Sequence, residues 1–217
     1  MTMRPTLVFL HTAAVHVPTF SALVAELAPG IPIHHIVAED LLAEARANGL
    51  TPALAKRVAA QIAAAGAVGA VLCTCSTIGG LAEAAATPEG PPVLRVDRAM
   101  AEAAVAAGPR IALVAALAST LAPTRALIEE VAAQVRPTVT INEILCEEAW
   151  PLFEVGDSAG YLAAIEICIR AVAPTVDVIV LAQASMAGAA LRCADLAVPV
   201  LSSPRLGVEA ALKLLNS

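Results

Sequence analysis

The chain has few aromatic residues and a deficit of positive charge. Aromatic side chains make up 2% of its 217 residues: one Trp, one Tyr and three Phe. We therefore expect aliphatic and small polar groups around any ligand, and no stacked nucleotide. Thirteen Lys and Arg against nineteen Asp and Glu leave a formal net charge of −6. Without a basic cluster, this charge argues against nucleic acid as a partner.

A membrane span and a secretion signal are also missing. Residues 58–82 carry no charge, but glycines and polar residues interrupt the run. We interpret it as the end of a helix, a buried strand and a new helix rather than a span. The first residues, Met-Thr-Met-Arg-Pro, lack the layout of a signal peptide. The sequence predicts a soluble, cytoplasmic protein with no membrane partner.

The five cysteines have neither the spacing of a disulfide framework nor that of a metal site. Their number is odd, and we expect all five to be reduced. Cys73 and Cys75 are too close for a zinc knuckle, and no second pair completes four ligands. Cys146, Cys168 and Cys193 lie in helical, alanine-rich contexts that are typical of packing thiols. We expect neither a metal ion nor an organic cofactor.

Strand-like and helix-like segments alternate along the chain. Apolar runs predict eight strands, over residues 6–10, 32–37, 68–73, 93–96, 110–115, 139–144, 178–182 and 198–201. Alanine-rich segments between them predict helices, for example over residues 52–65, 98–107, 123–135 and 161–172. This alternation is typical of the α/β class, with parallel sheets and right-handed crossovers.

The two halves of the chain repeat one pattern. Residues 68–77 (VGAVLCTCST) and 177–186 (DVIVLAQASM) are each an apolar run that closes in a small polar turn. The tripeptide PVL also recurs, at 92–94 and 199–201. The repeat spacing of about 105–109 residues suits one half-domain. In a gapless alignment Cys75 falls opposite Ala184, and a shift of one residue would place it opposite Gln183.

This repeat predicts two pseudo-symmetric lobes, each a parallel sheet flanked by helices. We expect residues 1–97 and 205–217 to form the first lobe and residues 98–204 the second. Ligands of open α/β sheets bind at the carboxyl ends of the strands. We therefore expect the active site in the cleft between the lobes.

Polar residues gather at the predicted strand ends. Hydroxyls that precede a helix lie beside exposed backbone N–H groups and the positive end of the helix dipole, and together these can bind an anion. The same hydroxyls can instead serve only as helix caps. A glutamine is a neutral donor and acceptor that can orient a carboxylate. The predicted substrate ligands are Thr12, Ser76, Thr77, Ser119, Thr120, Gln183 and Ser185.

Cys75 is the candidate catalytic thiol. It follows a strand and precedes the predicted helix 78–86, a position that exposes and activates a thiol. Cys73 is instead predicted to point into the core from its strand. His11 ends the first strand and is the candidate second acid/base group, with a structural role as the open alternative. His34 and His35 are expected at the surface.

Four of these segments together resemble the aspartate/glutamate racemase superfamily, which includes hydantoin racemase, maleate isomerase and arylmalonate decarboxylase. They are TCSTIG at 74–79, RVDRAMAE at 95–102, STLAPT at 119–124 and LAQASMA at 181–187. The resemblance covers nearly the whole chain. It implies two similar α/β lobes and cofactor-independent chemistry, in which two facing cysteines move a proton at the carbon beside a carboxylate. Cys75 matches the first of those positions, and the second is not a cysteine here.

Three functions follow as alternatives, all with a small carboxylate as the ligand. The first is a racemase or epimerase of an amino acid or related carboxylate, with Cys75 as one acid/base and a group such as His11 as the other. The second is a single-thiol decarboxylase or cis–trans isomerase of a small diacid. The third is a non-catalytic carboxylate-binding protein. The sequence does not decide between a monomer and a homo-oligomer.

Overall fold

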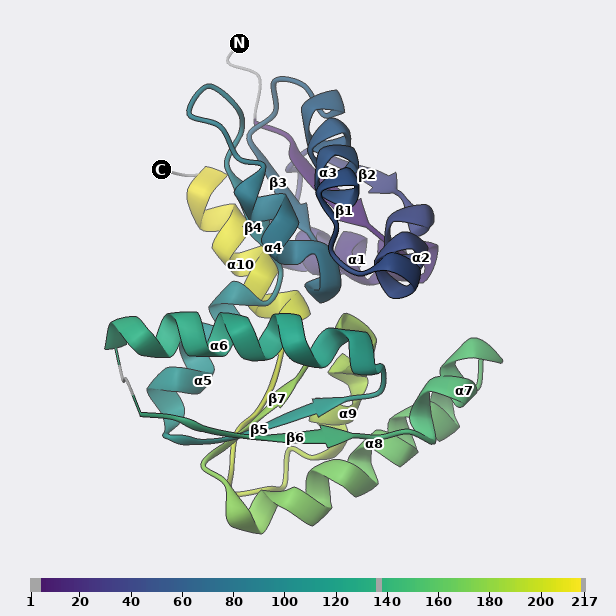
Figure 1. Ribbon diagram of the computed structural model, residues 1–217, viewed down its shortest axis with the longest axis vertical. Coiled ribbons are helices and arrows are strands. Elements are labelled where there is room, and N and C mark those ends of the chain that lie inside the picture. The colour runs from purple at the N-terminus through teal and green to yellow at the C-terminus, as the bar shows by residue number, and fades with distance from the viewer. Residues whose placement is uncertain (1–4, 136–137, 216–217) are drawn as a thin grey trace. The chain divides into compact units, whose positions relative to one another are not determined.

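The computed structural model describes residues 5–135 and 138–215 and divides into two compact units (Figure 1). The first unit runs to Asp97 and resumes at Pro204, and the second is Arg98–Ser203. Each unit is a four-stranded parallel sheet flanked by helices, as the alternating pattern predicted.

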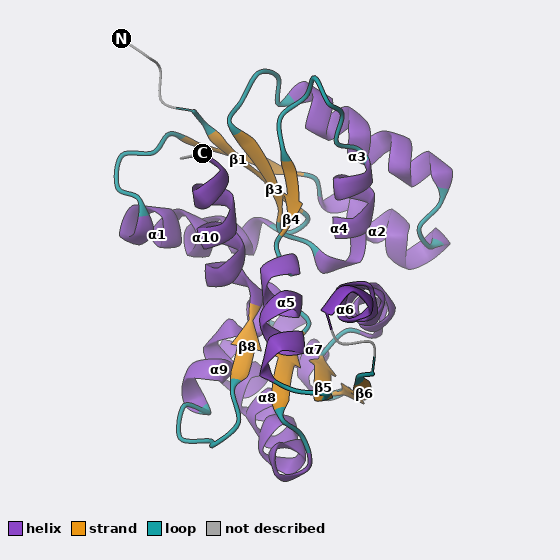
Figure 2. Cartoon of the chain, turned by 90° about the vertical axis from the view of Figure 1, so that its left-hand side faces the viewer, coloured by secondary structure: helices purple, strands orange, loops and turns teal. Residues whose placement is uncertain are grey.

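The first unit has the strand order β2-β1-β3-β4. Its strands are β1 (Leu7–His11), β2 (Ile33–Val37), β3 (Ala70–Cys73) and β4 (Val93–Arg95). Its helices are η1 (Ala14–His16), α1 (Val17–Leu27), α2 (Glu39–Asn48), α3 (Pro52–Ala64), α4 (Ser76–Ala84) and α10 (Ser203–Leu215). Helices α1 and α10 cover one face of the sheet, and α2, α3 and α4 cover the other (Figure 2).

The second unit has the equivalent order, β6-β5-β7-β8. Its strands are β5 (Arg110–Ala115), β6 (Thr140–Leu145), β7 (Val178–Leu181) and β8 (Val200–Ser202). Its longer helices are α5 (Arg98–Ala107), α6 (Leu121–Val135), α7 (Ala149–Glu154), α8 (Ser158–Val172) and α9 (Ala187–Arg192). Short 3₁₀ turns are η2 (Ala118–Thr120), η3 (Ala173–Thr175) and η4 (Ala184–Met186).

The central strands carry the core of each unit. All residues of β1, β3 and β7 are buried, whereas the edge strands β2, β4, β6 and β8 are partly exposed. Continuous apolar runs suit strands that are covered on both faces, which is why the sequence pattern identified them. Helix α3 begins where Thr51 accepts a hydrogen bond from Leu54 N at 3.2 Å.

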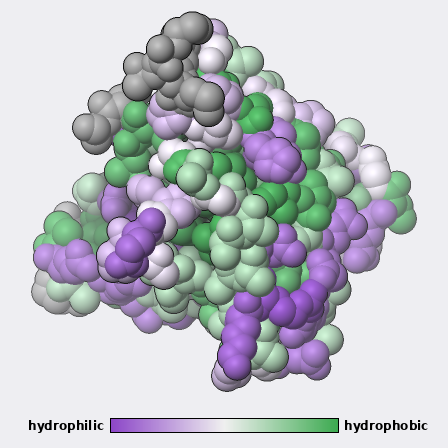
Figure 3. Space-filling view, turned by 90° about the horizontal axis from the view of Figure 1, so that it is seen from above, coloured by the Kyte–Doolittle hydropathy of each residue, from purple (hydrophilic) through white to green (hydrophobic). Residues whose placement is uncertain are grey.

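The viewed surface shows hydrophilic and hydrophobic residues interspersed (Figure 3). Within residues 5–135 and 138–215, no helix has both the length and the apolar character needed to cross a membrane.

The hydrogen-bond registers of the two sheets correspond residue by residue. In the first unit, Leu10 O accepts the N–H of Thr74 at 3.0 Å, where β1 and β3 end. In the second unit, Val114 O accepts the N–H of Ala182 at 2.9 Å, where β5 and β7 end. Thr74 therefore corresponds to Ala182.

This register corrects the gapless alignment by one residue. Counted from the shared hydrogen bond, Cys75 corresponds to Gln183 and not to Ala184. Both residues also have extended backbones, with φ/ψ of −110/114 for Cys75 and −126/139 for Gln183, and both immediately precede a helical turn. Which residues of the two units are equivalent is decided by the backbone pairing between strands. The similarity of the apolar runs in the sequence does not reveal that pairing.

The expectation of five reduced cysteines is wrong for one pair. Cys146, directly after β6, and Cys168 in α8 form a disulfide with 6.5 Å between their Cα atoms. Cys73, Cys75 and Cys193 are free. The two paired cysteines are 22 residues apart, and only the packing of α8 beside the end of β6 brings them together.

Thiol titration in denaturant measures this pairing. Protein purified without reductant is expected to give three thiols per chain, and reduced protein all five. Five thiols in the unreduced protein would contradict the pairing. A Cys168→Ser variant is the matched control, because it should leave Cys146 free to react under both conditions.

Candidate active site

Helix α4 begins at the carboxyl edge of the first sheet with Cys75 as its N-cap. Cys75 is half-buried, and its own side chain makes no capping hydrogen bond to the helix. The first N–H groups of a helix have no partner within the helix, and they attract anions. The turn therefore presents a thiol beside backbone donors.

A buried hydroxyl lies in the same turn. Thr77 is only 4% exposed, and within the described part of the chain its Oγ1 has no hydrogen-bond partner. Buried hydroxyls are normally paired, since an unpaired one costs free energy. Thr12, directly after the neighbouring strand β1, and Ser76 are buried at this edge as well. An unpartnered hydroxyl donor at a helix N-terminus fits a carboxylate oxygen.

A buried ion pair between Arg95 and Asp97 fixes the start of α4. Arg95 donates to both carboxylate oxygens of Asp97, at 2.6 and 3.0 Å, and its Nη2 donates to Ser76 O at 3.3 Å. The guanidinium packs against Gly79, where a Cβ would lie 2.9 Å from Arg95 Cβ and 3.1 Å from Nε. Gly79 thus gives Arg95 the space to reach the first turn of α4.

A Gly79→Ala change is expected to lower the free energy of unfolding by about 1–3 kcal/mol, because the added methyl overlaps with Arg95. Urea denaturation measures the difference. Gly80→Ala is the matched control: its Cβ would lie 3.5 Å from Arg95 Nη1, an ordinary contact. Alanine favours a helix, so Gly80→Ala should be neutral or stabilising by up to about 1 kcal/mol. Equal losses in both variants would contradict this explanation.

Cys73 is a core residue, as predicted. It is fully buried at the end of β3, and its Sγ donates to Cys75 O at 3.8 Å. Burial, and then the neighbouring Cys75, raises the pKa of the Cys73 thiol. A buried thiol with a raised pKa is a poor acid/base group, which leaves Cys75 as the candidate at this edge.

His11 does not fit the predicted role of second acid/base group. Its ring is fully buried, and both nitrogens are engaged, Nδ1 with Thr74 Oγ1 and Nε2 with His35 Nδ1, each at 2.8 Å. Burial, then His35 and His16, lowers the pKa of His11 to about 3. His34 is exposed as expected, but His35 is half-buried and hydrogen-bonded rather than a surface residue.

In the second unit, hydroxyls follow β5 at the start of α6. Thr120 Oγ1 donates to Leu117 O at 2.7 Å, so this hydroxyl caps a turn. The buried Oγ atoms of Ser119 and Thr124 have no partner among the residues that the structure describes. Sequence reasoning missed Thr124, although it is the last residue of the STLAPT segment and lies in the first turn of α6.

Gln183 is held by its amide oxygen. The side chain is 8% exposed, and Oε1 accepts from Ala116 N at 2.7 Å and Leu117 N at 3.1 Å. The oxygen is therefore engaged, and the amide N–H groups are what Gln183 can offer to a ligand.

Ser185 is oriented by a residue that sequence reasoning missed. The Tyr161 hydroxyl in α8 lies 2.7 Å from Ser185 Oγ, and burial raises the pKa of Tyr161 to about 12. Ser119, Thr120, Gln183 and Ser185 stay predicted substrate ligands.

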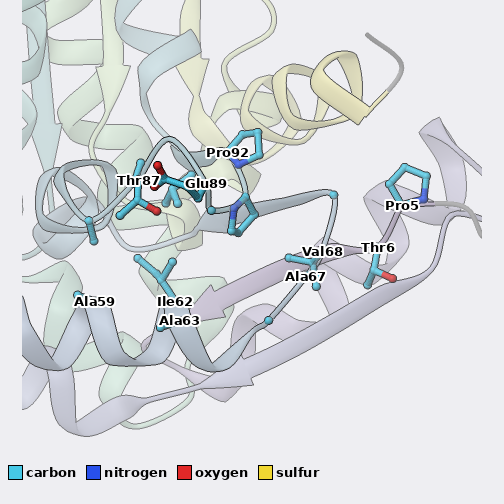
Figure 4. Close-up of a pocket in the computed structure, with 17 residues that line it drawn as sticks. Pro5, Thr6, Ala59, Ile62, Ala63, Ala67, Val68, Thr87, Glu89 and Pro92 are labelled. Carbon is cyan, nitrogen blue, oxygen red and sulfur yellow. The ribbon is translucent and has the colours of Figure 1, made fainter.

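A pocket of about 900 Å³ in the first unit lies at the opposite end of the sheet (Figure 4). It is lined by Thr6 and by residues of the segments 59–69 and 85–93, which meet at the amino ends of β1, β3 and β4. Its lining is mostly small and apolar, with Glu89 as its titratable side chain. Over residues 5–135 and 138–215, no three His, Cys, Asp or Glu side chains are grouped to hold a metal ion.

Comparison with known families identifies the chain's relatives. A family model described as Asp/Glu/hydantoin racemase matches residues 16–211. The chain belongs to this family. No curated protein matches the sequence.

Solved structures of the racemase family share the fold at low sequence identity. A glutamate racemase from Bacillus anthracis is 14% identical with a TM-score of 0.69, over 98% of this chain and 82% of that one. An aspartate racemase from Picrophilus torridus is 13% identical with a TM-score of 0.71, over 97% and 94%. A glycine-to-cysteine mutant of arylmalonate decarboxylase is 21% identical with a TM-score of 0.65, over 98% and 94%.

Proposed function

We propose that this protein is a cofactor-independent enzyme in which Cys75 is the single acid/base thiol acting on a small carboxylate. The observation that carries the proposal is the first turn of α4. There the thiol lies at the N-terminus of the helix, its side chain does not cap the helix, and the Thr77 hydroxyl in the same turn has no partner among the described residues. A carboxylate held by these donors would bring its α-carbon to the sulfur.

The proposed chemistry is proton transfer at that carbon. In decarboxylation of a malonate-type diacid, the bond to one carboxyl group breaks, carbon dioxide leaves, and the electron pair stays as an enolate-like intermediate. Hydroxyl and N–H donors on the remaining carboxylate stabilise that charge. The Sγ–H proton of Cys75 then joins the carbon, and the thiolate takes a proton from water.

The second unit supports chemistry that uses one thiol. Racemisation requires a base on one face of the carbon and an acid on the other. Gln183 corresponds to Cys75, and a glutamine amide does not titrate near neutral pH. We therefore favour decarboxylation of a malonate-type diacid, or cis–trans isomerisation of a small diacid, as the reaction.

Racemisation or epimerisation of an amino acid or related carboxylate is the second candidate. Membership of the racemase family, and the naming of several structural neighbours as racemases, favour it. It would need a proton carrier other than Gln183, and the buried His11 is unsuited to supply it.

Incubation in D₂O with substituted malonates, cis-diacids, enantiopure amino acids and hydantoins tests the proposal. Decarboxylation is expected to release carbon dioxide and place deuterium on the α-carbon in a single configuration. Isomerisation is expected to convert a cis-diacid to its trans form. Cys75→Ser should abolish either activity, with Cys73→Ser as the control.

Deuterium exchange with loss of optical activity in an amino acid or hydantoin would overturn the favoured reaction in favour of racemisation. If no compound turns over, but a diacid protects Cys75 from alkylation, the protein binds carboxylates without catalysis and the enzymatic proposal fails.

A further inference from the structure

A chain of hydrogen bonds crosses the first sheet and ends at the residue before Cys75. Ser21 of α1 lies 2.9 Å from His35 Nε2, His35 Nδ1 lies 2.8 Å from His11 Nε2, and His11 Nδ1 lies 2.8 Å from Thr74 Oγ1. The chain thus links a helix, β2, β1 and the end of β3. We call it the histidine chain.

The direction of these bonds follows from the last one. The Thr74 hydroxyl donates to Leu10 O at 3.3 Å, because a carbonyl can only accept. Thr74 then accepts from the Nδ1–H of His11. Because burial lowers the pKa of His11 to about 3, its ring is neutral and its Nε2 accepts from the Nδ1–H of His35. The Nε2 of His35 accepts from the Ser21 hydroxyl. Burial also lowers the pKa of His35, so both rings are neutral and every ring nitrogen has one defined partner.

Aromatic packing holds the two rings in place. The His11 and His35 rings are 5.0 Å apart between centroids, and Phe9 lies 5.7 Å from His11 and 5.0 Å from His35. Phe20 lies 5.5 Å from His11 and 5.4 Å from Phe9. Two of the three phenylalanines in the whole protein are thus committed to fixing this pair.

The second unit is an internal control for the role of the histidine chain. By strand register, His11 corresponds to Ala115 and Thr74 to Ala182, so the inner half of the chain has no counterpart there. The residue that corresponds to Cys75 is Gln183. Its position is fixed by the hydrogen bonds that its own amide oxygen accepts, and not by a neighbouring histidine.

The outer half of the histidine chain does have a counterpart. His35 corresponds to Glu143 in the edge strand β6, and Glu143 pairs with Arg125 of α6, as His35 pairs with Ser21 of α1. A link from helix to edge strand is therefore common to both units. Among the described residues, the further links through His11 and Thr74 to the end of β3 occur only in the unit that carries the Cys75 thiol.

We propose that His11 is a positioning residue for Cys75. It acts through Thr74, whose N–H and hydroxyl both donate to Leu10 O and whose Oγ1 accepts a hydrogen bond from His11 Nδ1–H. These bonds fix the backbone just before the N-cap, and with it the place of the thiol at the start of α4. The inference rests on the proposed function of Cys75, and its test does not require that a substrate be known.

The rate of Cys75 alkylation by iodoacetamide, followed by mass spectrometry in the folded protein, is the test. His11→Phe keeps a ring of similar volume, and Thr74→Val keeps the shape of the threonine side chain. Both variants remove the hydrogen bond between His11 Nδ1 and Thr74 Oγ1. Each is expected to slow alkylation at least about fivefold, because a thiol displaced from the start of α4 moves away from the positive end of the helix dipole, which favours the reactive thiolate. His11→Asn and Thr74→Ser retain a donor and a hydroxyl and should stay within about twofold of the wild-type rate.

Thr175→Val is the matched control, since it removes a hydroxyl that donates to Val172 O in the second unit. It should leave the alkylation rate unchanged. A rate in folded Thr74→Val or His11→Phe that equals or exceeds the wild-type rate would overturn the inference, as would slow alkylation in Thr74→Ser. If His11→Phe does not fold, Thr74→Val decides.

Turnover separates this inference from the proposed function. With an active substrate, His11→Phe should lower kcat and leave KM within about twofold, because the binding donors of α4 remain. A rise in KM with unchanged kcat would overturn the inference. If no compound is turned over by the wild type, the proposed function fails and the alkylation rates alone judge the positioning role.

Discussion

Replacing Cys75 with serine is expected to lower kcat on the proposed carboxylate substrate by about 10²–10⁴-fold, while substrate affinity changes little. A serine hydroxyl keeps the shape of the side chain but does not ionise near neutral pH. The Thr77 hydroxyl is unchanged, and a charged carboxylate binds the N–H groups at the start of α4 more strongly than the new serine hydroxyl at the N-cap does. Steady-state kinetics and equilibrium binding of the same compound measure the two effects separately.

Cys73→Ser is the control, because it makes the same chemical change two residues away. The Cys73 side chain is fully buried, so a hydroxyl there is expected to cost about 1–2 kcal/mol of stability with little effect on kcat. If Cys73→Ser is inactive and Cys75→Ser active, the assignment of the reactive thiol is wrong. If both variants retain activity, the thiol mechanism is wrong.

Acidification from pH 7.5 to 5 is expected to lower the free energy of unfolding by about 2 kcal/mol through His11 alone. Burial, then His35 and His16, lowers the pKa of His11 from 6.5 to about 3. Between these values the unfolded chain binds a proton that the folded protein does not. The contribution of His11 to the free energy of unfolding is therefore fully present above pH 6.5. It falls by about 1.4 kcal/mol per pH unit as the pH drops from 6.5 towards 3.

Urea denaturation of the wild type and of His11→Asn at both pH values isolates this contribution. The variant should lose about 2 kcal/mol less than the wild type between pH 7.5 and 5. His34→Asn, at an exposed histidine of the same unit, should keep the wild-type pH dependence. The same pH dependence in wild type and His11→Asn would show that His11 is already charged in the folded protein.

Much of the fold follows from local sequence patterns. The eight predicted strands all occur, because each is an apolar run bounded by turns, and the helices between them make the sheets parallel. Boundaries moved by one or two residues, as at β3, which begins at Ala70 rather than residue 68. The position of Cys75 at a strand–helix junction was also predictable, because it depends only on its neighbours in the chain.

The partners of individual side chains were not predictable in the same way. His35 was expected at the surface because it lies near the start of a predicted strand, yet its ring is hydrogen-bonded to His11 on the neighbouring strand β1. Cys146 and Cys168 were expected to be free, and the packing of α8 pairs them. Arg95 was not expected to hold Asp97, because neither residue alone indicates a buried ion pair.

The sequence by itself determined the α/β class, the duplication, the family resemblance and the thiol at the start of α4, because these depend on composition, periodicity and short segments. The tertiary structure alone decided that Gln183 corresponds to Cys75, that His11 is buried with both nitrogens engaged, and that Thr77 has an unpartnered hydroxyl within the described residues. The physical reason is that hydrogen-bond register and burial arise between segments far apart in the chain. Local patterns place a residue on an element, and only the packing of that element gives the side chain its partners.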